Sequence, residues 1–218
     1  MRKIAFLILT TINCLMTYGQ DTKIIVGFDL TPTVTSLRGN SMTDDYDARF
    51  SISTGLTFEY IIYKNISIKS GLAYERKGSK SSIFIMDETE PILENQDIRL
   101  NFDYLTLPIL VSVATKGKTT LYVNAGPYFG FLLSQKIKYS AVGSYPEMTV
   151  DNLDYSRRMD FGLSIGLGLN IHLTKKLLLD LGLRETWGLL NTSKTEVIDD
   201  GSIKTNSFGL LLGLKYKL

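Results

Sequence analysis

Thirteen charged residues recur within, or within two residues of, segments that alternate between bulky apolar residues and small or polar ones. All stand on the small or polar side of that alternation, with six acids against seven bases. Because buried charges need partners, this placement predicts a network of ion pairs where those sides face one another. Glu59 and Lys69 become direct neighbours if a turn of three residues separates their segments. The thirteen residues are Asp29, Arg49, Glu59, Lys69, Glu75, Lys77, Arg99, Asp103, Arg158, Asp160, Asp180, Arg184 and Lys215.

Residues suited to catalysis or metal binding are few. His172 is the single histidine of the chain. One histidine makes no histidine-rich metal site, and Ser and Asp are too frequent here for any pair to identify a catalytic triad. The carboxylates between the alternating segments lack the spacing of a dedicated calcium loop. We therefore expect no catalytic residues, no cofactor and no metal site, with an enzyme that uses His172 as its base as the alternative.

Strict alternation is typical of β-strands that have two chemically different faces. The segment DFGLSIGLGLNIHL, residues 160–173, places apolar residues at every second position from Phe161 to Leu173. Within residues 98–114 the apolar positions change phase, and we expect a bulge near Pro108, since proline donates no ladder hydrogen bond. Eight such segments occur, at residues 24–31, 49–60, 66–75, 98–114, 119–133, 160–173, 177–184 and 207–218.

The connections between these segments are alternately long and short along the chain. Three are short, at residues 62–65, 115–118 and 174–176, and suit antiparallel hairpins. Four are long and polar, at residues 34–48, 78–97, 134–155 and 188–203, and we expect them to be loops. Short turns at one end and long loops at the other are typical of an up-and-down antiparallel sheet.

The chemistry of the two faces separates a membrane barrel from a soluble one. The face opposite the apolar residues is rich in glycine, whereas a water-exposed face would carry longer polar side chains. An eight-stranded barrel has room inside for little more than packed side chains, so the glycine face should point inward and the apolar face toward lipid. The predicted fold is therefore an all-β, eight-stranded antiparallel up-and-down transmembrane β-barrel. A soluble barrel with a cavity lined by Phe161, Ile165 and Leu169 is the alternative.

The first residues predict export. A basic start, an apolar run from Ile4 to Leu9 and a small residue, Gly19, are typical of a cleaved signal peptide. Its removal would discard Cys14, the single cysteine, and two of the 24 basic residues, which leaves the bases equal in number to the 22 acids. A chain without net charge gives no reason to expect a nucleic-acid partner. The expected division is residues 1–19 for the signal and 20–218 for the barrel.

Several stretches resemble one family. The signal ending in YGQ, the segments DYLTLPILVSV and LYVNAGPYFGFLL, and the closing GLLLGLKYKL are similar to the PorT-like small outer-membrane β-barrel proteins of Bacteroidetes-type bacteria. The last residues also resemble the carboxy-terminal signal read by the barrel-assembly machinery. Gly213, Tyr216 and Leu218 stand at the expected spacing, with Leu218 in place of the usual terminal aromatic residue. The resemblance implies outer-membrane location and a role beside the protein-secretion and gliding apparatus with which PorT-like proteins are associated.

These observations together predict a non-enzymatic protein of the outer membrane. It would act as a membrane scaffold with external binding loops, or as an accessory of an envelope or secretion machine. Its expected partners are outer-membrane lipid, the barrel-assembly machinery and an envelope or secretion protein. Two alternatives stay open: an outer-membrane enzyme acting on lipid or peptide, and a soluble periplasmic lipocalin-like binding barrel.

Overall fold

A computed structural model of the chain describes residues 23–85, 94–143, 145–197 and 201–218. The expected signal segment, residues 1–19, lies outside the described residues. Within the ranges that are described, no helix has the length and apolar character needed to cross a membrane.

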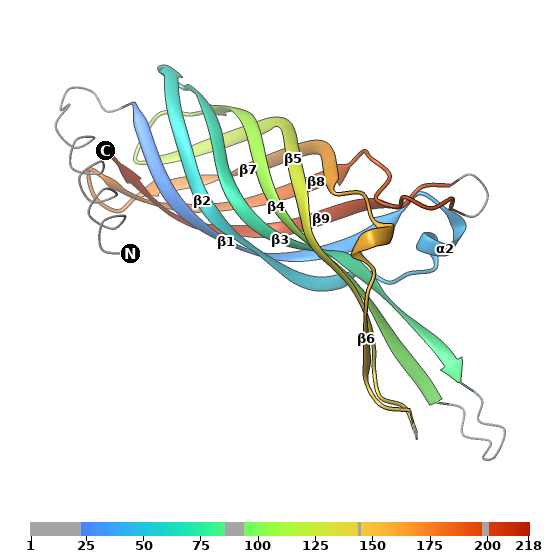
Figure 1. Ribbon diagram of the computed structural model, residues 1–218. Helices are drawn as coiled ribbons and strands as arrows, with labels where there is room; N and C mark the ends of the chain where they lie inside the picture. The colour runs from blue at the N-terminus through green and yellow to red at the C-terminus, as the bar shows by residue number, and fades with distance from the viewer. Residues whose placement is uncertain (1–22, 86–93, 144, 198–200) are drawn as a thin grey trace, which may run out of the picture.

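Eight antiparallel strands close into a ring (Figure 1). Around the ring the order is β1-β2-β3-β4-β5-β7-β8-β9, and β9 pairs back with β1. A short ninth strand, β6 (Met148–Asp151), pairs with the end of β5. The expected eight-stranded up-and-down barrel is confirmed. The ring strands are β1 (Ile24–Arg38), β2 (Arg49–Tyr63), β3 (Ile66–Ile85), β4 (Glu94–Ala114), β5 (Thr119–Tyr139), β7 (Met159–His172), β8 (Leu177–Gly188) and β9 (Lys204–Lys217).

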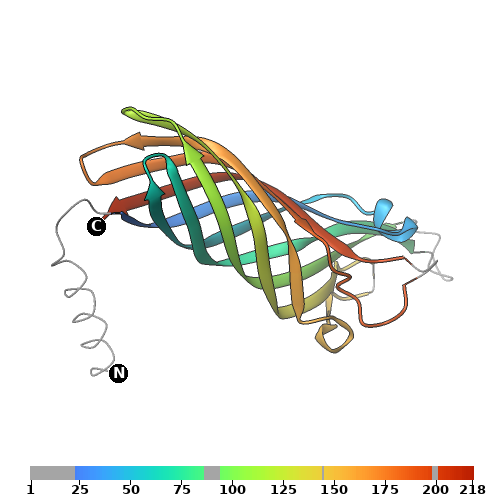
Figure 2. The same cartoon turned by 90° about the horizontal axis from the view of Figure 1, so that it is seen from above.

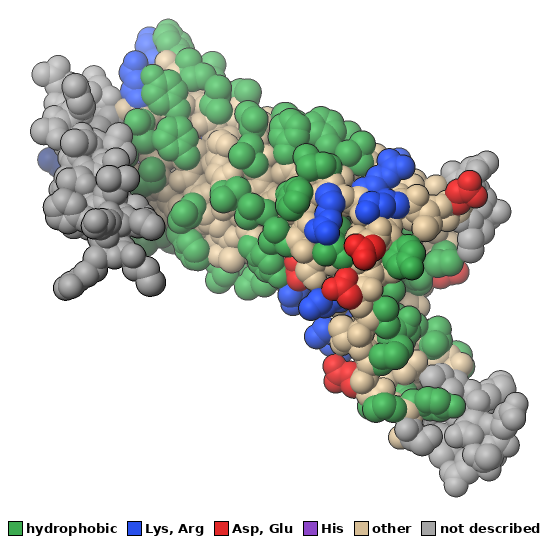
Figure 3. Space-filling view, viewed as in Figure 1, with side chains coloured by type: hydrophobic (Ala, Val, Ile, Leu, Met, Phe, Trp, Pro, Cys, Tyr) green, Lys and Arg blue, Asp and Glu red, His purple; other side chains and the backbone are tan. Residues whose placement is uncertain are grey.

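The alternation of the sequence separates the two surfaces of the ring. In β7, Leu167 is 57% exposed on the outside, whereas Ser164 is 2% exposed on the inside. Apolar side chains cover the outer surface of the ring on the face that Figure 3 shows. Phe161, Ile165 and Leu169 belong to this outer face. The soluble alternative, which placed these three around a central cavity, is therefore wrong.

Several strands continue past the ring at the end with the long connections. The pairing of β3 with β2 ends at Glu75, but β3 pairs with β4 up to Ile85. The β3–β4 hairpin and β6 project from the barrel (Figure 1). The expectation of loops is therefore wrong for residues 34–38, 78–85, 94–97, 134–139 and 148–151, which are strand. The alternation marks only strands with an apolar and a polar side, and these polar stretches lack that contrast.

The structure also corrects the expected bulge near Pro108. The pairing of β3 with β4 has no shift anywhere along its length. The shift lies in β5 instead, where Leu133 is an extra residue between the partners of Asp103 and Tyr104. The apparent change of phase in β4 arises because Phe102 and Tyr104 are buried inside the barrel, although their size is typical of lipid-facing residues.

The short connections lie at the opposite end of the barrel, together with the start of β1 and the end of β9 (Figure 2). At the other end, the connection after β1 forms a single helical turn, α2 (Ser41–Asp44). Asn40 caps this turn, because its side chain accepts a hydrogen bond from the Thr43 backbone amide at 2.9 Å. A 3₁₀ turn, η1 (Leu153–Tyr155), precedes β7 at the same end.

Candidate functional site

The interior of the ring, called the bore below, holds buried charges. Five carboxylates and four cations of the predicted network point into it from six of the eight ring strands. They form two clusters, one toward the long connections and one toward the short turns. The nine residues are Asp29, Glu59, Lys69, Glu75, Lys77, Asp160, Asp180, Arg184 and Lys215.

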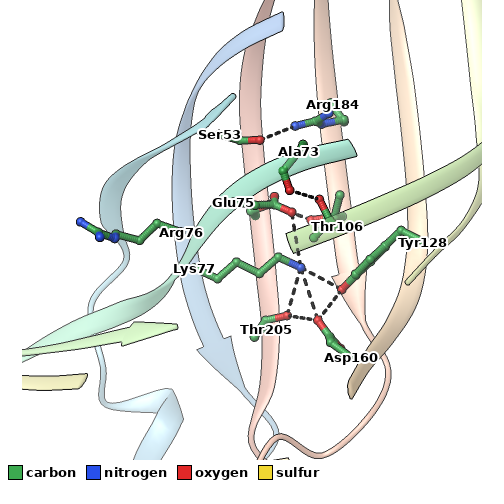
Figure 4. A network of polar contacts seen from close by, with 12 residues as sticks. Ser53, Ala73, Glu75, Arg76, Lys77, Thr106, Tyr128, Asp160, Arg184 and Thr205 are labelled. Atoms are coloured by element: carbon green, nitrogen blue, oxygen red, sulfur yellow. Dashed lines mark hydrogen bonds and ion pairs between the residues drawn. The ribbon is translucent and has the colours of Figure 1, made fainter. Parts of the chain in front are cut away.

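The cluster near the long connections surrounds Lys77, whose side chain is completely buried. Its Nζ donates to the Tyr128 hydroxyl at 2.9 Å and lies 3.4 Å from Oδ2 of Asp160 and 3.8 Å from Oε2 of Glu75. Tyr128 and Thr205 also donate to Asp160, at 2.9 and 3.2 Å. Figure 4 shows these side chains converging from separate strands of the ring. We call them the Lys77 cluster.

The cluster near the short turns surrounds Lys215 of β9. Its Nζ forms an ion pair with Asp180 and lies 3.6 Å from Oε2 of Glu59. Lys69 lies 3.8 Å from the same Glu59 oxygen, and the two residues are cross-strand partners, as their spacing predicted. The Lys69 ammonium also lies 3.6 Å from the centre of the Tyr122 ring. We call this group the Lys215 cluster.

Arg184 and Asp29 lie between the two clusters. Arg184 donates to the Ser53 hydroxyl at 3.1 Å. Both residues line a cavity of about 50 Å³, together with Lys69, Asp180 and Lys215. A space of this size holds only on the order of a few water molecules.

The structure places four residues of the predicted network, Arg49, Arg99, Asp103 and Arg158, outside the bore. Asp103 shares the outer face with its cross-strand partner Arg76, and the two form an ion pair with Nε 2.6 Å from Oδ1. Arg158 is exposed beside Leu132 of β5 and donates to its backbone carbonyl. Arg49 lies at the rim, where it donates to Asn101 and to a backbone carbonyl.

The physical reasons for these corrections differ. The alternation predicted the wrong face for β4, because the large residues Phe102 and Tyr104 resemble residues that face lipid. In the structure Asp103 and the exposed Arg99 lie on the outer face. Figure 4 shows the consequence in the neighbouring strand, where Arg76 points away from the cluster that holds Lys77. Arg158 precedes β7 and lies beyond the region in which alternation assigns a face.

A small hydrophobic core lies in the long-connection end of the barrel. Leu37 of β1, Phe102 and Tyr104 of β4 and Leu132 of β5 are almost fully buried against one another. Tyr46, Leu100, Leu153 and Ile203 pack around them. Burial is the main cause that raises the pKa of the Tyr46 hydroxyl, which belongs to the connection after α2 and lies outside the membrane-spanning strands. We call the four buried residues the apolar plug.

Tyrosines are the part of the site that the charge pattern missed. Tyr128 bonds to both Lys77 and Asp160, and Tyr122 packs beneath Lys69. A signal for both was available in the sequence, because they stand on the glycine side of the β5 alternation rather than on the apolar side. A large residue on the glycine-rich side of a strand therefore predicts a side chain that lies in the bore and fills it.

The remaining candidates lie at the short-turn end. His172 lines a shallow cavity there, and its Nδ1 lies 2.9 Å from the Lys118 carbonyl oxygen. Among the described residues, no group of three or more His, Cys, Asp or Glu side chains is placed to hold a metal ion. Of the C-terminal residues, Gly213 faces the bore, Tyr216 faces outward, and the Leu218 amide donates to the Ile24 carbonyl. Their role as an assembly signal stays a prediction.

The arrangement inside the bore joins strands that are distant in sequence. The Lys77 cluster ties β3 to β5, β7 and β9, and the Lys215 cluster ties β9 to β2, β3 and β8. Buried charges of both signs neutralise one another there. A buried carboxylate without its cation would lower the free energy of unfolding. The bore is therefore filled by side chains that hold the ring together.

Comparison with known proteins agrees with this geometry. The family model described as outer membrane protein beta-barrel domain matches residues 19–194. No curated protein matches the chain. The crystal structure of Neisserial surface protein A is 16% identical, with a TM-score of 0.50, and the match covers 90% of this chain and 97% of that one.

Two further solved structures match with lower TM-scores. The outer membrane protein OprG from Pseudomonas aeruginosa is 12% identical, covers 92% of this chain and 98% of its own, and gives a TM-score of 0.49. Ail of Yersinia pestis is 15% identical and gives a TM-score of 0.42, and the match covers 88% of this chain and 97% of that one. The apolar outer face, the filled bore and the family match agree: the chain belongs to the outer membrane protein beta-barrel domain family and is a protein of the outer membrane.

Proposed function

We propose that this protein is a non-enzymatic anchor, which holds a rigid β-sheet outside the membrane for a partner protein of the envelope. The observation that carries the proposal is the extension of β3, β4, β5 and β6 beyond the ring. We call this part of the molecule the sheet extension, formed by residues 78–85, 94–101, 136–139 and 148–151.

The outermost part of the sheet extension carries exposed apolar side chains. Phe84 is 72% exposed, and Ile83, Met148 and Tyr145 are each about half exposed. Charged rows on the outer face, at Arg76 and Lys80, separate these residues from the lipid-facing surface of the ring. Apolar groups beyond such charges meet water rather than lipid, and exposed apolar patches commonly mark protein contacts.

The edges of the sheet extension also favour a protein partner. Among the described strands, β6 pairs with β5 alone. Beyond Lys80, whose backbone bonds to that of Asp47, β3 pairs only with β4 among the described residues. Free strand edges offer backbone donors and acceptors to an added strand. A partner could therefore dock by strand addition and cover Phe84 at the same time.

We infer further that the chain is a PorT-like barrel whose partner belongs to a secretion or gliding machine. The support is the resemblance of DYLTLPILVSV, LYVNAGPYFGFLL and GLLLGLKYKL to that family. A non-enzymatic role is supported by the position of His172, which ends β7 at the short turn before β8, at the opposite end of the barrel from the sheet extension. The filled bore supports a role in anchoring rather than in conduction.

Photo-crosslinking in intact outer membranes tests the proposal. Phe84 is replaced by benzoyl-phenylalanine in one strain, and the lipid-facing Leu56 in the control strain. The proposal predicts a protein adduct of defined mass at residue 84 and none at residue 56. The variant Phe84→Ser with Ile83→Ser should lose co-purification of the same protein while the barrel keeps its heat-dependent gel shift.

Two results would overturn the proposal. One is the absence of any protein adduct at residue 84 under conditions in which the chain is folded in the membrane. The other is a hydrolytic activity on lipid or peptide that disappears in His172→Ala, which would establish the enzyme alternative.

A further inference from the structure

The outer face of β3, β4 and β5 changes character along the strands. Residues directly opposite one another in the register share a face, so this face can be followed row by row. Near the edge of the ring, the row Tyr74, Leu105 and Phe131 is apolar. The next row begins with the ion pair between Arg76 and Asp103, and the Arg76 guanidinium also donates to the Tyr74 hydroxyl at 3.0 Å.

Two rows farther out, three cations stand side by side. Lys80 is the register partner of Arg99, and Arg99 is the register partner of Lys138. All three side chains are exposed. Residues directly opposite on antiparallel strands have Cβ atoms about 5 Å apart, and like charges in that relation are destabilising. We call these residues the cation row.

Within the described part of the chain, no carboxylate forms an ion pair with the cation row, and Asp97 stands in the next row outward on the same face. The register partner of Lys138 on β6 is Thr149, and none of the three cations lies within ion-pair distance of a described carboxylate. More positive charge lies nearby, since Lys136 occupies the intervening row and both Arg76 and Arg99 repel the Arg49 guanidinium. Asp151 faces Lys136 across the β5–β6 pair.

The position of the cation row relative to the lipid-facing surface identifies what could neutralise it. Six residues separate Lys80 from Tyr74 along β3, which is about 20 Å of strand, or about 14 Å along the normal for a tilt of about 45°. The polar headgroup layer extends about 5–7 Å beyond the hydrocarbon on each side, and the long side chains of the cation row reach it by extending back toward the apolar surface. On the face that Figure 3 shows, Lys and Arg side chains gather where the strands leave the apolar surface of the ring.

The geometry points to a binding site for phosphorylated lipid headgroups on this face, with Lys80, Arg99 and Lys138 as the phosphate-binding residues. The acyl chains of the same lipid lie against Leu105 and Phe131 on the adjoining apolar surface. A phosphate between the three side chains removes the repulsion within the row, which is the physical reason that such an arrangement can be stable. The site is independent of the proposed protein partner, because the partner surface lies farther out at Phe84.

Lipid retention by the purified full chain tests this inference. The protein is mixed in neutral detergent with lipid A or with phosphatidylcholine, and the bound lipid is counted by native mass spectrometry. The test variant is Lys80→Gln with Arg99→Gln and Lys138→Gln. The matched control, Lys116→Gln with Lys118→Gln and Lys175→Gln, removes three exposed charges at the short-turn end.

The wild type and the control should retain lipid A at least about tenfold better than phosphatidylcholine, and the test variant should lose that preference, since each cation contributes to attraction of anionic lipid. Equal retention of the two lipids by the wild type would overturn the inference, as would an unchanged preference in the test variant. Displacement of lipid A by inorganic phosphate at equal concentration would show a phosphate site rather than a lipid site. Stronger binding of heparin through the same three residues would assign the surface to acidic polysaccharide instead.

Discussion

The hydroxyl oxygen of Tyr122 lies 2.7 Å from the place where a Cβ atom would stand on Gly182, and at the same distance from that place on Gly168. Neither glycine has a left-handed backbone that would itself require glycine. They are needed for space, because the Tyr122 side chain of β5 lies over its register partner Gly168 on β7 and over Gly182 on β8. The glycine-rich inner face and the large side chains that fill the bore are therefore two aspects of one packing arrangement.

This relationship predicts a specific coupling. Gly182→Ala should destabilise the barrel, because the new methyl group meets the Tyr122 hydroxyl. In a chain that also carries Tyr122→Phe the cost should shrink, with an interaction free energy of about 1 kcal/mol. Urea titration of the four chains in lipid vesicles, followed by Trp187 fluorescence, gives the complete cycle. Strict additivity of the two substitutions would contradict the packing account.

The Lys77 cluster predicts a large loss of stability when its cation is removed. Lys77→Met leaves Glu75 and Asp160 buried without the ammonium group, which should cost about 3–5 kcal/mol of unfolding free energy. Exposed Lys116 gives the control, since Lys116→Met should change stability by less than about 0.5 kcal/mol. Adding Asp160→Asn to Lys77→Met should restore part of the loss. The same urea titration measures all three, and equal stability of the two lysine variants would exclude a structural role for the cluster.

The apolar plug predicts a local effect at one end of the barrel. Leu37→Ala removes a side chain that is 3% exposed and should cost about 2–5 kcal/mol in that region. Amide hydrogen exchange should accelerate in β4 around Phe102 and Tyr104, while the exchange of β7 and β8 stays slow. Leu56→Ala on the lipid-facing surface is the control, and its effect should be smaller because lipid fills the space that is left. Uniform acceleration in all strands would contradict a localised plug.

The sequence predicted the ring well and the extension poorly, for one physical reason. Within the membrane each strand separates lipid from a packed bore, so residues such as those of β7 alternate strictly. Beyond the membrane both faces of a strand meet water, and a stretch such as GSKSSIFI, residues 78–85, loses that signal. Its strand structure comes from pairing with β4, which no local pattern encodes.

The charged site was predicted in part for a related reason. Glu59 and Lys69 are cross-strand partners as expected, although the turn has two residues rather than three and a register shift between Ile61 and Tyr63 makes up the difference. Asp103 was placed in the bore because its neighbours Phe102 and Tyr104 are large and apolar, which resembles a lipid-facing pattern. The contacts of Lys77 with Asp160 on β7 and Thr205 on β9 join strands far apart in the sequence. Closure of the ring brings these groups together, and only the three-dimensional structure shows it.

The orientation of the two faces is the claim on which the whole account depends, and site-directed spin labelling tests it most directly. In a chain expressed without residues 1–19, which contain the single cysteine, Leu167→Cys and Ser164→Cys each carry one label after reconstitution in lipid vesicles. The label at residue 167 should be relaxed strongly by oxygen dissolved in the bilayer, whereas the label at residue 164 should be immobilised and shielded from it. A shielded label at residue 167 together with an oxygen-accessible label at residue 164 would contradict the account.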